Sequence, residues 1–304
     1  MEVRHRISAA IRDARRRLAA AGIDSADAEA RALVRHAAGA ERSLVLIDEL
    51  PEHFAELLEA ALQRRERREP LQLILGAAPF RRLSLEVWPG VFIPRPETEL
   101  AIDLVHAFAQ TGQPVKRVVD LCTGSGTLAA AMADEFPGTS IWAVDLSERA
   151  VALARRNIQR ASGGGAEAPL IRVLCADVGE HLAAPGGLLA EAVGADVVLS
   201  NPPYIPPGAV PRDPEVLRCD PEAALYGGGA DGLAVPEQVV RTARTLLRPG
   251  GLFVMEHADV QGESARMLLG RVGGFVAIRT HPDLTGRDRF VVARRAQSDP
   301  EMRD

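Results

Sequence analysis

The sequence predicts an α/β fold in which a small helical bundle and a β-hairpin linker precede a mostly parallel, seven-stranded sheet with an antiparallel last strand. Three observations lead to this prediction. Residues 1–69 carry apolar side chains at helical spacing. From 115 to 258, β-branched runs alternate with helical patterns, which is the rhythm of a parallel sheet. Only a short loop joins the last two strand-like runs, 275–283 and 288–295, so these should pair antiparallel.

Composition and charge exclude several classes of protein. The chain has 304 residues, of which 47% are hydrophobic, enough for a core in each of two domains. Its formal net charge of −5 gives no global reason to bind nucleic acid, since phosphate contacts need clustered Lys and Arg. No run of about eighteen apolar residues occurs, so no membrane span is predicted. We therefore expect a cytoplasmic protein and a monomer, with nucleic acid as the less favoured substrate.

The three cysteines, Cys122, Cys175 and Cys219, indicate neither a disulfide framework nor a metal site. Their number is odd and none stands in a C-x-x-C spacing. This usage fits a reducing compartment and a protein without a bound metal.

Segment 1–69 is predicted to be a helical domain of its own. Its apolar residues recur at helical spacing, as at Ile11, Ala14 and Leu18. The charge run 64–69, RRERRE, closes the last of these helices. A solvated face of mixed sign is the favoured interpretation of this run, and an RNA contact is the alternative.

The rest of the chain divides into three parts. Residues 70–99 form short alternating stretches broken by Gly and Pro, which predicts a β-hairpin linker. Residues 100–296 hold the predicted sheet, and 297–304 are predicted to be a disordered tail. The parallel strands are expected at 115–122, 140–146, 171–178, 195–203 and 250–258, with a short helix after the third and a long loop after the fourth.

A turn of small residues follows the first of these strands and is a candidate ligand site. Gly124 and Gly126 would let the backbone approach a ligand closely, where a Cβ would intrude. A Gly-x-Gly alone also fits an ordinary strand-to-helix turn. The candidate cofactor-binding residues of this turn are Asp120, Cys122, Thr123, Gly124, Ser125 and Gly126.

Acidic residues after the next strands suggest which ligand this is. Asp145 ends the second strand nineteen residues beyond Gly126, where its carboxylate can accept both hydroxyls of a ribose. That spacing is shared with NAD-binding folds, but the D-x-x-T-G-S-G turn favours S-adenosylmethionine, whose ammonium Asp120 could hold. After the third strand, Asp177 and the Val178 amide could meet adenine, although Asp177 could equally cap a helix.

The fourth strand runs into Asn201-Pro202-Pro203-Tyr204, which is the candidate reaction site. In open α/β sheets, ligands bind at the carboxyl ends of strands near the point where the strand order reverses. The prolines fix φ and remove two amide donors, so the Asn201 side-chain oxygen and the Pro202 carbonyl form a stiff wall of acceptors. Two acceptors suit one NH2 group, and Tyr204 offers a flat ring to a planar substrate.

This arrangement suits methylation of a conjugated nitrogen. The lone pair of an amide or an aromatic amine is delocalised, and holding both hydrogens out of plane would localise it and aim it at the methyl group. Catalysis would then be mostly orientation, without a Cys or Ser nucleophile and without a conventional base. The alternative for the two prolines is a polyproline loop after a buried strand, which leaves the Asn before and the Tyr after them unexplained.

With these residues the chain resembles the HemK-type protein-(glutamine-N5) methyltransferases that modify peptide chain release factors. The likeness covers nearly the whole length. It rests on the Asn-Pro-Pro-Tyr motif at 201–204, the turn at 120–126, and the narrower signal Phe-Ile-Pro-Arg-Pro-Glu-Thr-Glu at 92–99. Segments 221–225 and 227–233 and the pair Glu256-His257 are also similar to that family.

The resemblance implies a Rossmann-like class I methyltransferase fold, S-adenosylmethionine as cofactor, and the glutamine of a Gly-Gly-Gln tripeptide in release factors as target. It implies that Asn201 and the Pro202 carbonyl hold the glutamine amide, that Pro203 and Tyr204 line its pocket, and that Asp145 binds the cofactor ribose. The helical segment 1–69 would then recognise the substrate.

The chain departs from the family pattern at two positions, and other functions remain open. Cys122 stands where the family more often has Gly, and Val178 where a tryptophan can occur near the adenine. Arg95 and Glu97 are expected either to shape the substrate or cofactor mouth or to form an interdomain salt bridge. The competing functions are an adenine-N6 methyltransferase on DNA or RNA, a ribosomal-protein glutamine methyltransferase, and a non-catalytic module that binds release factors or ribosomes.

Overall fold

The computed structural model describes residues 2–40, 44, 47–163, 170–179, 182–211 and 213–297. It divides into two compact units. The first comprises Met1–Ala77 together with Pro211–Cys219, and the second comprises Ala78–Val210 together with Asp220–Asp304. The tail predicted at 297–304 lies outside the described residues beyond Gln297.

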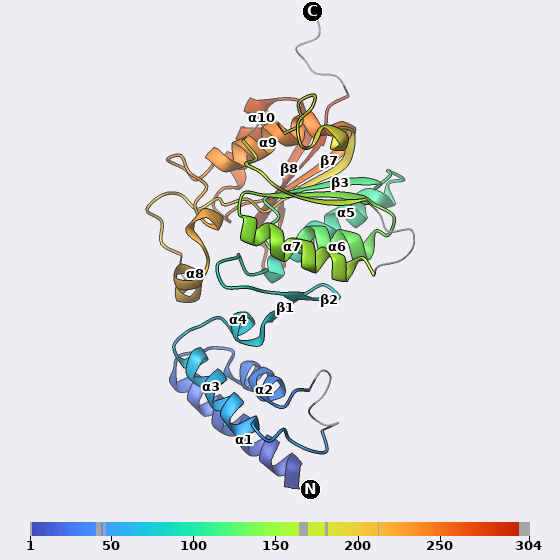
Figure 1. Ribbon diagram of the computed structural model, residues 1–304. Helices are drawn as coiled ribbons and strands as arrows, with labels where there is room; N and C mark the ends of the chain where they lie inside the picture. The colour runs from blue at the N-terminus through green and yellow to red at the C-terminus, as the bar shows by residue number, and fades with distance from the viewer. Residues whose placement is uncertain are drawn as a thin grey trace, which may run out of the picture. The chain divides into compact units, whose positions relative to one another are not determined.

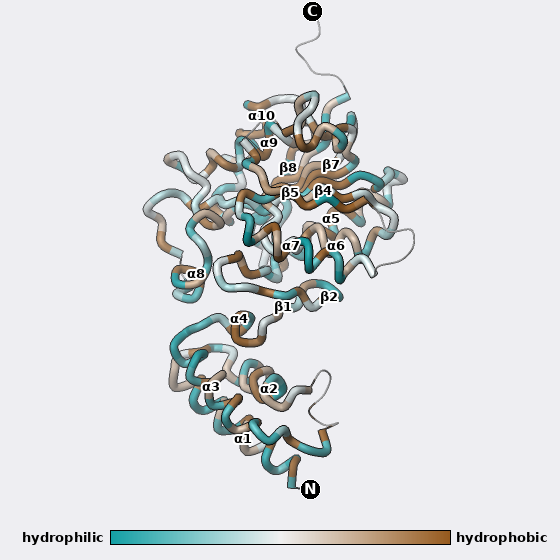
Figure 2. Tube along the Cα trace, viewed as in Figure 1, coloured by the Kyte–Doolittle hydropathy of each residue, from teal (hydrophilic) through white to brown (hydrophobic). Residues whose placement is uncertain are grey.

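The first unit is a helical bundle, as predicted (Figure 1). Its helices are α1 (Glu2–Ala20), α2 (Ala26–Ala37), α3 (Phe54–Glu66), α4 (Leu71–Leu75) and α8 (Pro214–Cys219). Leu18, Leu33 and Leu62 pack at the centre of its apolar core, and Figure 2 shows apolar and polar residues alternating along these helices. The apolar periodicity of segment 1–69 therefore builds one core.

The helical unit is larger than segment 1–69. Helix α4 lies within the predicted linker, but its Ile74 is buried in the helical core. The hairpin itself is shorter than predicted, with β1 (Ala77–Phe80) and β2 (Leu83–Glu86). The difference has a local cause, since Leu71 to Leu75 is an apolar run followed by Gly76 in the left-handed conformation, which ends a helix.

The charge run 64–69 corrects a prediction. Arg64 pairs with Glu69 on the surface, as expected for a solvated face. Arg65, however, is buried and donates from Nε to Glu29 Oε2 at 2.5 Å and from Nη1 to Glu215 Oε1 at 2.9 Å. A guanidinium has five donors in a fixed fork, so one side chain joins α2 and α8. Glu215 lies 150 positions away along the chain, and no local pattern reveals that pairing.

The second unit holds the predicted seven-stranded sheet, in the order β5-β4-β3-β6-β7-β9-β8. The strands are β3 (Arg117–Leu121), β4 (Ser140–Asp145), β5 (Ile171–Cys175), β6 (Ala195–Ser200), β7 (Leu247–Glu256), β8 (Phe275–Pro282) and β9 (Asp288–Arg295). The pairs among β3 to β7 are parallel. β9 pairs antiparallel with both β7 and β8, so the antiparallel last strand is confirmed.

Helices cover both faces of this sheet (Figure 1). One face packs on α5 (Leu100–Gln110), α6 (Thr127–Glu135) and α7 (Glu148–Ala161), and the other on α9 (Ala234–Leu246) and α10 (Gly262–Val272). Successive strand residues point to opposite faces, so Phe253 and Val254 enter different cores. Because both faces are covered, a central strand such as β6 is buried along its whole length without alternation.

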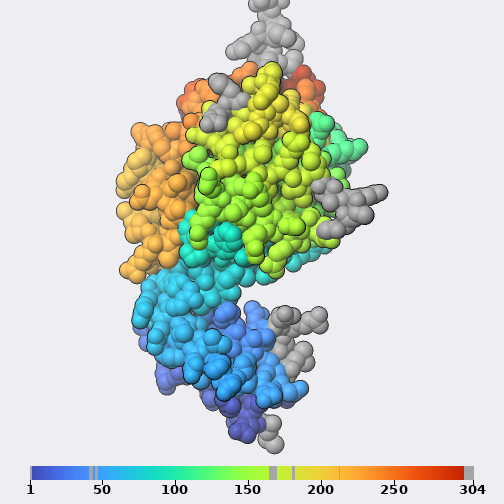
Figure 3. Space-filling model, in the orientation of Figure 1, coloured from blue at the N-terminus to red at the C-terminus, as the bar shows by residue number. Residues whose placement is uncertain are grey.

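The segment between the hairpin and α5 lies against α7 in the same unit. The Asn157 Oδ1 accepts a hydrogen bond from the Glu86 amide at 2.8 Å, and Arg149 Nε donates to the Pro89 carbonyl at 2.7 Å. Figure 3 shows the corresponding teal and green surfaces in contact. The segment then passes through the short helix η2 (Pro96–Glu99) into α5. This path carries residues 90–98 to the carboxyl end of the sheet.

The short helix predicted after the third parallel strand is present as a single turn of 3-10 helix in the part of this connection that the structure describes. Turns and the three-residue helix η3 (Ala190–Ala192) follow β5, and residues 180–181 lie outside the described ranges. The stretch 183–187 contains Pro185, Gly186 and Gly187, which favour turns over helix.

Within the described ranges, no helix is long and apolar enough to cross a membrane.

Candidate active site

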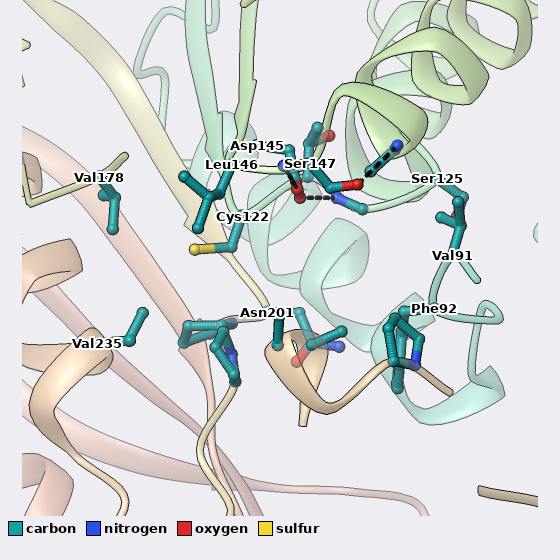
Figure 4. A pocket seen from close by; sticks show the side chains of 18 of the residues that line it. Val91, Phe92, Cys122, Ser125, Asp145, Leu146, Ser147, Val178, Asn201 and Val235 are labelled. Atoms are coloured by element: carbon teal, nitrogen blue, oxygen red, sulfur yellow. Dashed lines mark hydrogen bonds between the residues drawn. The ribbon is translucent and has the colours of Figure 1, made fainter. Parts of the chain in front are cut away.

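A cavity of about 610 Å³ opens at the carboxyl end of the sheet, within the second unit. The strand order reverses between β3 and β6, which is where open α/β sheets bind ligands. The ends of β4, β3 and β6 supply Asp145, Cys122 and Asn201, and in Figure 4 Cys122 lies between the other two. The predicted site residues that line this cavity are Arg95, Asp120, Cys122, Thr123, Gly124, Ser125, Asp145, Asp177, Val178, Asn201, Pro202, Pro203 and Tyr204.

The two glycines of the turn after β3 have different roles. Gly124 has φ of 56°, and no described atom lies within 4 Å of the position of its missing Cβ, so that Cβ would stand in open space. Gly124 lines the cavity, which agrees with close approach of a ligand. Gly126 has φ of 79°, and its Cβ would stand 2.8 Å from Ala154 Cα on α7. Gly126 does not line the cavity. At Gly126 the close neighbour is therefore α7, and its predicted cofactor contact stays a prediction.

Asp145 is fixed at the end of β4 by two backbone amides. Its Oδ2 accepts from Gly124 N at 2.8 Å and its Oδ1 from Ser147 N at 2.9 Å. Each carboxylate oxygen has two lone pairs, so both keep an acceptor position free. Burial raises the pKa of this carboxyl above its usual range, and the amide donors counteract part of that rise. The side chain is thus held rigidly at the cavity and can still accept from a diol.

Asp120 is buried and has one unsatisfied oxygen. Its Oδ2 accepts from Thr123 Oγ1 at 2.5 Å and from Ala129 N at 3.1 Å. Its Oδ1 has no hydrogen-bond partner among the described residues. Burial raises the pKa of Asp120 to about 7. A buried oxygen without a donor is unfavourable, so this side of the cavity favours a cationic group on the ligand.

Apolar side chains line another part of the cavity. Figure 4 shows Leu146, Val178 and Val235 on the same side of Cys122. Asp177, which precedes Val178, accepts from Gly179 N at 2.8 Å and so closes a tight turn instead of capping a helix. The predicted adenine contact and this turn use the same carboxylate, which has lone pairs for both.

Cys122 adopts the left-handed conformation, with φ of 59°. This region is unfavourable for residues other than Gly, Asn and Asp, so Gly would fit this position without strain. Burial raises the pKa of its thiol well above the usual range. The thiol is therefore neutral, in keeping with the prediction that no cysteine nucleophile takes part.

Asn201 is half-buried at the end of β6, and its amide is oriented by a neighbour. Its Nδ2 donates to Thr98 Oγ1 at 3.2 Å. Because the nitrogen is engaged, the Oδ1 remains as the free acceptor of this side chain. Pro202 is buried directly after it. Asn201 and Pro202 both line the cavity, and the pairing of their two acceptors with one NH2 group stays a prediction.

A second glycine-rich segment supports this wall from behind. A Cβ on Gly227 would stand 2.5 Å from the Pro203 carbonyl oxygen, and one on Gly232 would stand 2.3 Å from the Tyr204 carbonyl oxygen. Backbone bonds join the same segments, from Ile205 N to Leu225 O at 2.8 Å and from Gly227 N to Ile205 O at 3.1 Å. The turn at 227–233 is therefore packed against the Asn-Pro-Pro-Tyr backbone at a distance that only glycine allows.

Tyr204 is held at both ends. Its hydroxyl faces Glu256 Oε1 at 3.4 Å, and its backbone carbonyl accepts from Gln261 Nε2 at 2.9 Å. Burial, together with the Glu256 carboxylate, raises the pKa of the phenol well above its usual range. The ring lines the cavity as a neutral phenol.

Arg95 and Glu97 lie in different environments. Arg95 lines the cavity, its Nη2 contacts Asp220 Oδ2 at 2.5 Å, and its guanidinium carbon lies 5.1 Å from the centre of the Phe92 ring. Both partners of this ion pair belong to the second unit. Glu97 is exposed and is not among the residues that line the cavity.

Thr98 and Glu256 contact the predicted site residues, and sequence analysis assigned them no role. Thr98 lines the cavity, and both side chains are about 3% exposed. Each stands in a segment that sequence analysis had singled out only for its resemblance, 92–99 and 256–257. Their contact spans 158 positions of the chain, which local patterns do not reveal.

Two family models match the chain. The model described as the PrmC N-terminal domain matches residues 9–76, and the model described as the methyltransferase small domain matches residues 89–212.

Curated relatives match nearly the whole chain. A release factor glutamine methyltransferase of Bifidobacterium longum is 41% identical over 93% of this chain and 97% of its own length. Those of Mycolicibacterium smegmatis and Streptomyces coelicolor are 42% and 41% identical, each over 95% of this chain and 98% of their own. Among solved structures, a methyltransferase from Pyrococcus furiosus is 17% identical, with a TM-score of 0.47, over 78% of this chain and 98% of that one.

Proposed function

The chain belongs to the family of release factor glutamine methyltransferases, and we propose that its cavity transfers a methyl group from S-adenosylmethionine to the side-chain amide nitrogen of a release factor glutamine. The target we propose is the glutamine of the Gly-Gly-Gln tripeptide. The observation that carries the proposal is the free Oδ1 of Asn201, beside the turn that binds the cofactor.

Asn201 and the Pro202 carbonyl provide two acceptors for the two hydrogens of one NH2 group. A primary amide presents such a group, and its nitrogen is a weak nucleophile because its lone pair is delocalised. Holding both hydrogens reduces that delocalisation and fixes the direction of the lone pair. Proline at 202 and 203 restricts φ, so the acceptors are placed before the substrate arrives.

The residues at the other side of the cavity fit S-adenosylmethionine, which supplies a methyl group on a sulfonium. We propose that Asp145 accepts from the ribose hydroxyls and that the unpaired Asp120 Oδ1 faces the ammonium. Asp177 and the Val178 amide would meet the adenine, between the apolar side chains of Leu146 and Val235. Cys122, Thr123 and Ser125 lie in the same turn as Asp120 and would also contact the cofactor.

The remaining residues of the site hold the substrate amide and exclude water. Tyr204 presents its ring to the planar amide, and Arg95 with Asp220 holds the segment that carries Pro221 and Leu225 at the cavity. Departure of a neutral thioether needs no acid, and the proton on nitrogen can leave after methyl transfer. Orientation is therefore the main contribution that these side chains make.

For the helical unit we propose recognition of the release factor. The matching family model at 9–76 covers nearly all of its first segment. The competing adenine-N6 reaction uses the same acceptors but requires a surface for a polyanion, and the net charge of −5 argues against one.

The direct test is label transfer from radioactive S-adenosylmethionine. The acceptors are a release factor with an intact Gly-Gly-Gln tripeptide, the same factor with its Gln replaced by Ala, a ribosomal protein mixture, and DNA or RNA. We expect label only on the intact factor. Label on nucleic acid or on ribosomal protein alone would overturn the substrate, and no label on any acceptor would favour a binding module.

A further inference from the structure

We propose that Thr98 and Glu256 are positioning residues that set which end of the Asn201 amide faces the substrate. The inference rests on the proposed glutamine methylation and adds to it two residues with defined tasks. Glu256 would fix the direction of the Thr98 hydroxyl, and Thr98 would fix the amide of Asn201.

The three side chains form one chain of hydrogen bonds. Thr98 Oγ1 donates to Glu256 Oε2 at 2.7 Å, and Asn201 Nδ2 donates to Thr98 Oγ1 at 3.2 Å. They come from three elements, since Thr98 lies in η2, Asn201 follows β6, and Glu256 ends β7. β6 and β7 are paired neighbours, so their carboxyl ends are adjacent.

The direction of each of these hydrogen bonds follows from the donors that each group has. An ionised carboxylate accepts only, so the single hydrogen of the Thr98 hydroxyl goes to Glu256. Thr98 then has only lone pairs left for Asn201, and only the NH2 end of an amide can donate to them. The Asn201 Oδ1 is thereby directed away from Thr98 and remains for the substrate NH2. The reversed amide would present two donors to a substrate group that also donates.

Burial keeps these hydrogen-bond partners from being replaced by water. Thr98 and Glu256 are each about 3% exposed, so water does not replace these partners readily. The second oxygen of Glu256 faces the Tyr204 hydroxyl at 3.4 Å, so the same carboxylate contacts two of the predicted site segments. Both hydrogen-bond partners of this buried carboxyl, Thr98 and Tyr204, line the cavity, and Arg289 supplies a nearby positive charge. A hydrocarbon would fill this space at a lower desolvation cost, so the carboxyl is most simply explained by its contacts at the site.

The experiment compares three variants with the wild type. Thr98→Val removes the hydroxyl at nearly constant volume, Thr98→Ser retains it, and Thr139→Val is the matched control. Thr139 is also buried and donates its hydroxyl to the Val115 carbonyl at 2.7 Å, but it does not line the cavity. We would measure kcat and KM with the release factor and the affinity for S-adenosylhomocysteine.

We expect Thr98→Val to lower kcat by about tenfold or more, with cofactor affinity within about threefold, because an amide free to flip is no longer preset. Thr98→Ser should stay within about threefold of the wild type and Thr139→Val should leave kcat unchanged. A wild-type kcat in Thr98→Val would overturn the inference. So would a Thr98→Ser variant as slow as Thr98→Val, because volume and not the hydroxyl would then matter.

A second readout does not depend on the substrate. The side-chain NH2 of Asn201 can be followed by nitrogen-15 NMR and assigned by its loss in Asn201→Asp. We expect its resonances to move in Thr98→Val and to stay near their wild-type positions in Thr98→Ser. Unmoved resonances in Thr98→Val would overturn the positioning role. The two readouts can also disagree. If Thr98→Val shifts the resonances as expected but the wild-type protein methylates no release factor, the proposed function is contradicted and the positioning of Asn201 is still supported.

Discussion

Asn201 lies where the turn at 120–126 and the proposed amide pocket meet. Its substitution therefore tests whether substrate orientation and cofactor binding depend on different groups. Asn201→Ala removes the free acceptor but leaves Asp145, Gly124 and the rest of the turn in place. We expect methyl transfer to be abolished while cofactor affinity stays within a few-fold of the wild type, since the lost acceptor serves substrate orientation. Single-turnover label transfer and calorimetric titration with S-adenosylhomocysteine measure the two quantities. Near-normal turnover would disprove the amide clamp.

Glu256 predicts how activity depends on pH. Burial raises the pKa of its carboxyl to about 7, with Glu97 also raising it and Thr98, Arg289 and Tyr204 opposing the rise. The ionised form is the one that fixes the Thr98 hydroxyl, whereas the protonated form can donate to Thr98 and reverse the amide. Turnover should therefore fall as pH drops through about 7 and rise above it.

A matched variant tests that assignment. Glu256→Gln has no proton to lose, so its turnover should be low and should lack the step near pH 7. Asp120 also has a pKa raised to about 7, and its ionisation affects cofactor binding, so kcat must be measured at saturating cofactor. If Glu256→Gln keeps the wild-type pH profile, the step belongs to another group.

At position 122 we expect Gly to give a more stable protein than Ala, which reverses the usual order. At most positions Ala is the more stabilising of the two, because Gly loses more backbone entropy on folding. With φ of 59°, position 122 strains any side chain of the ordinary L type. Cys122→Gly should therefore be more stable than Cys122→Ala, by about 1 kcal/mol in urea unfolding. The opposite order would show that the turn relaxes to another conformation.

At the scale of the elements, the two glycines of the turn should fail in different ways. Gly126→Ala puts a Cβ 2.8 Å from Ala154 Cα at the contact of α6 and α7. It should lower the free energy of unfolding by about 2 kcal/mol or more, because neither backbone can move independently. Gly124→Ala meets open space and should lower it by only about 1 kcal/mol, from its φ alone.

Cofactor affinity gives the complementary result. The Cβ of Gly124→Ala would point into the cavity and should weaken S-adenosylhomocysteine binding by about tenfold or more. Where Gly126→Ala remains folded, its affinity should fall less. Equal effects of both variants on affinity would mean that the turn responds as one rigid piece.

The sequence predicted the strands and the polar residues at their ends more successfully than the contacts between segments. Apolar runs such as the one at 195–200 and the spacing from Gly126 to Asp145 are local and depend on strand geometry alone. The extent of the helical unit depends on Ile74 finding the helical core, and the contact of Thr98 with Glu256 depends on three elements meeting. Such tertiary contacts leave no periodic trace in the sequence.

At the scale of the whole molecule, the chain visits the helical unit twice. After the Asn-Pro-Pro-Tyr motif it leaves the second unit at Val210, forms α8 within the first unit, and returns at Asp220. Pro221 and Leu225, which follow that return, line the cavity. The ion pair of Arg65 with Glu215 therefore links α8 to the rest of the helical unit.

Neighbouring arginines test this link. Arg65 and its partners Glu29 and Glu215 have side chains only 8% and 11% exposed, so Arg65→Met would leave Glu29 buried without a guanidinium, while Glu215 would keep only Arg68, 2.9 Å away. We expect a loss of roughly 3–5 kcal/mol in the stability of the helical unit. Arg64→Met breaks an exposed pair with Glu69 and should cost under about 1 kcal/mol.

Hydrogen exchange locates the effect. In Arg65→Met the amides of α2, α3 and α8 should exchange faster, whereas those of β3 and β6 should keep their wild-type protection, since these strands lie in the other unit. An Arg65→Met variant whose α8 stays protected would show that α8 is attached without Arg65, through Arg68 and apolar packing.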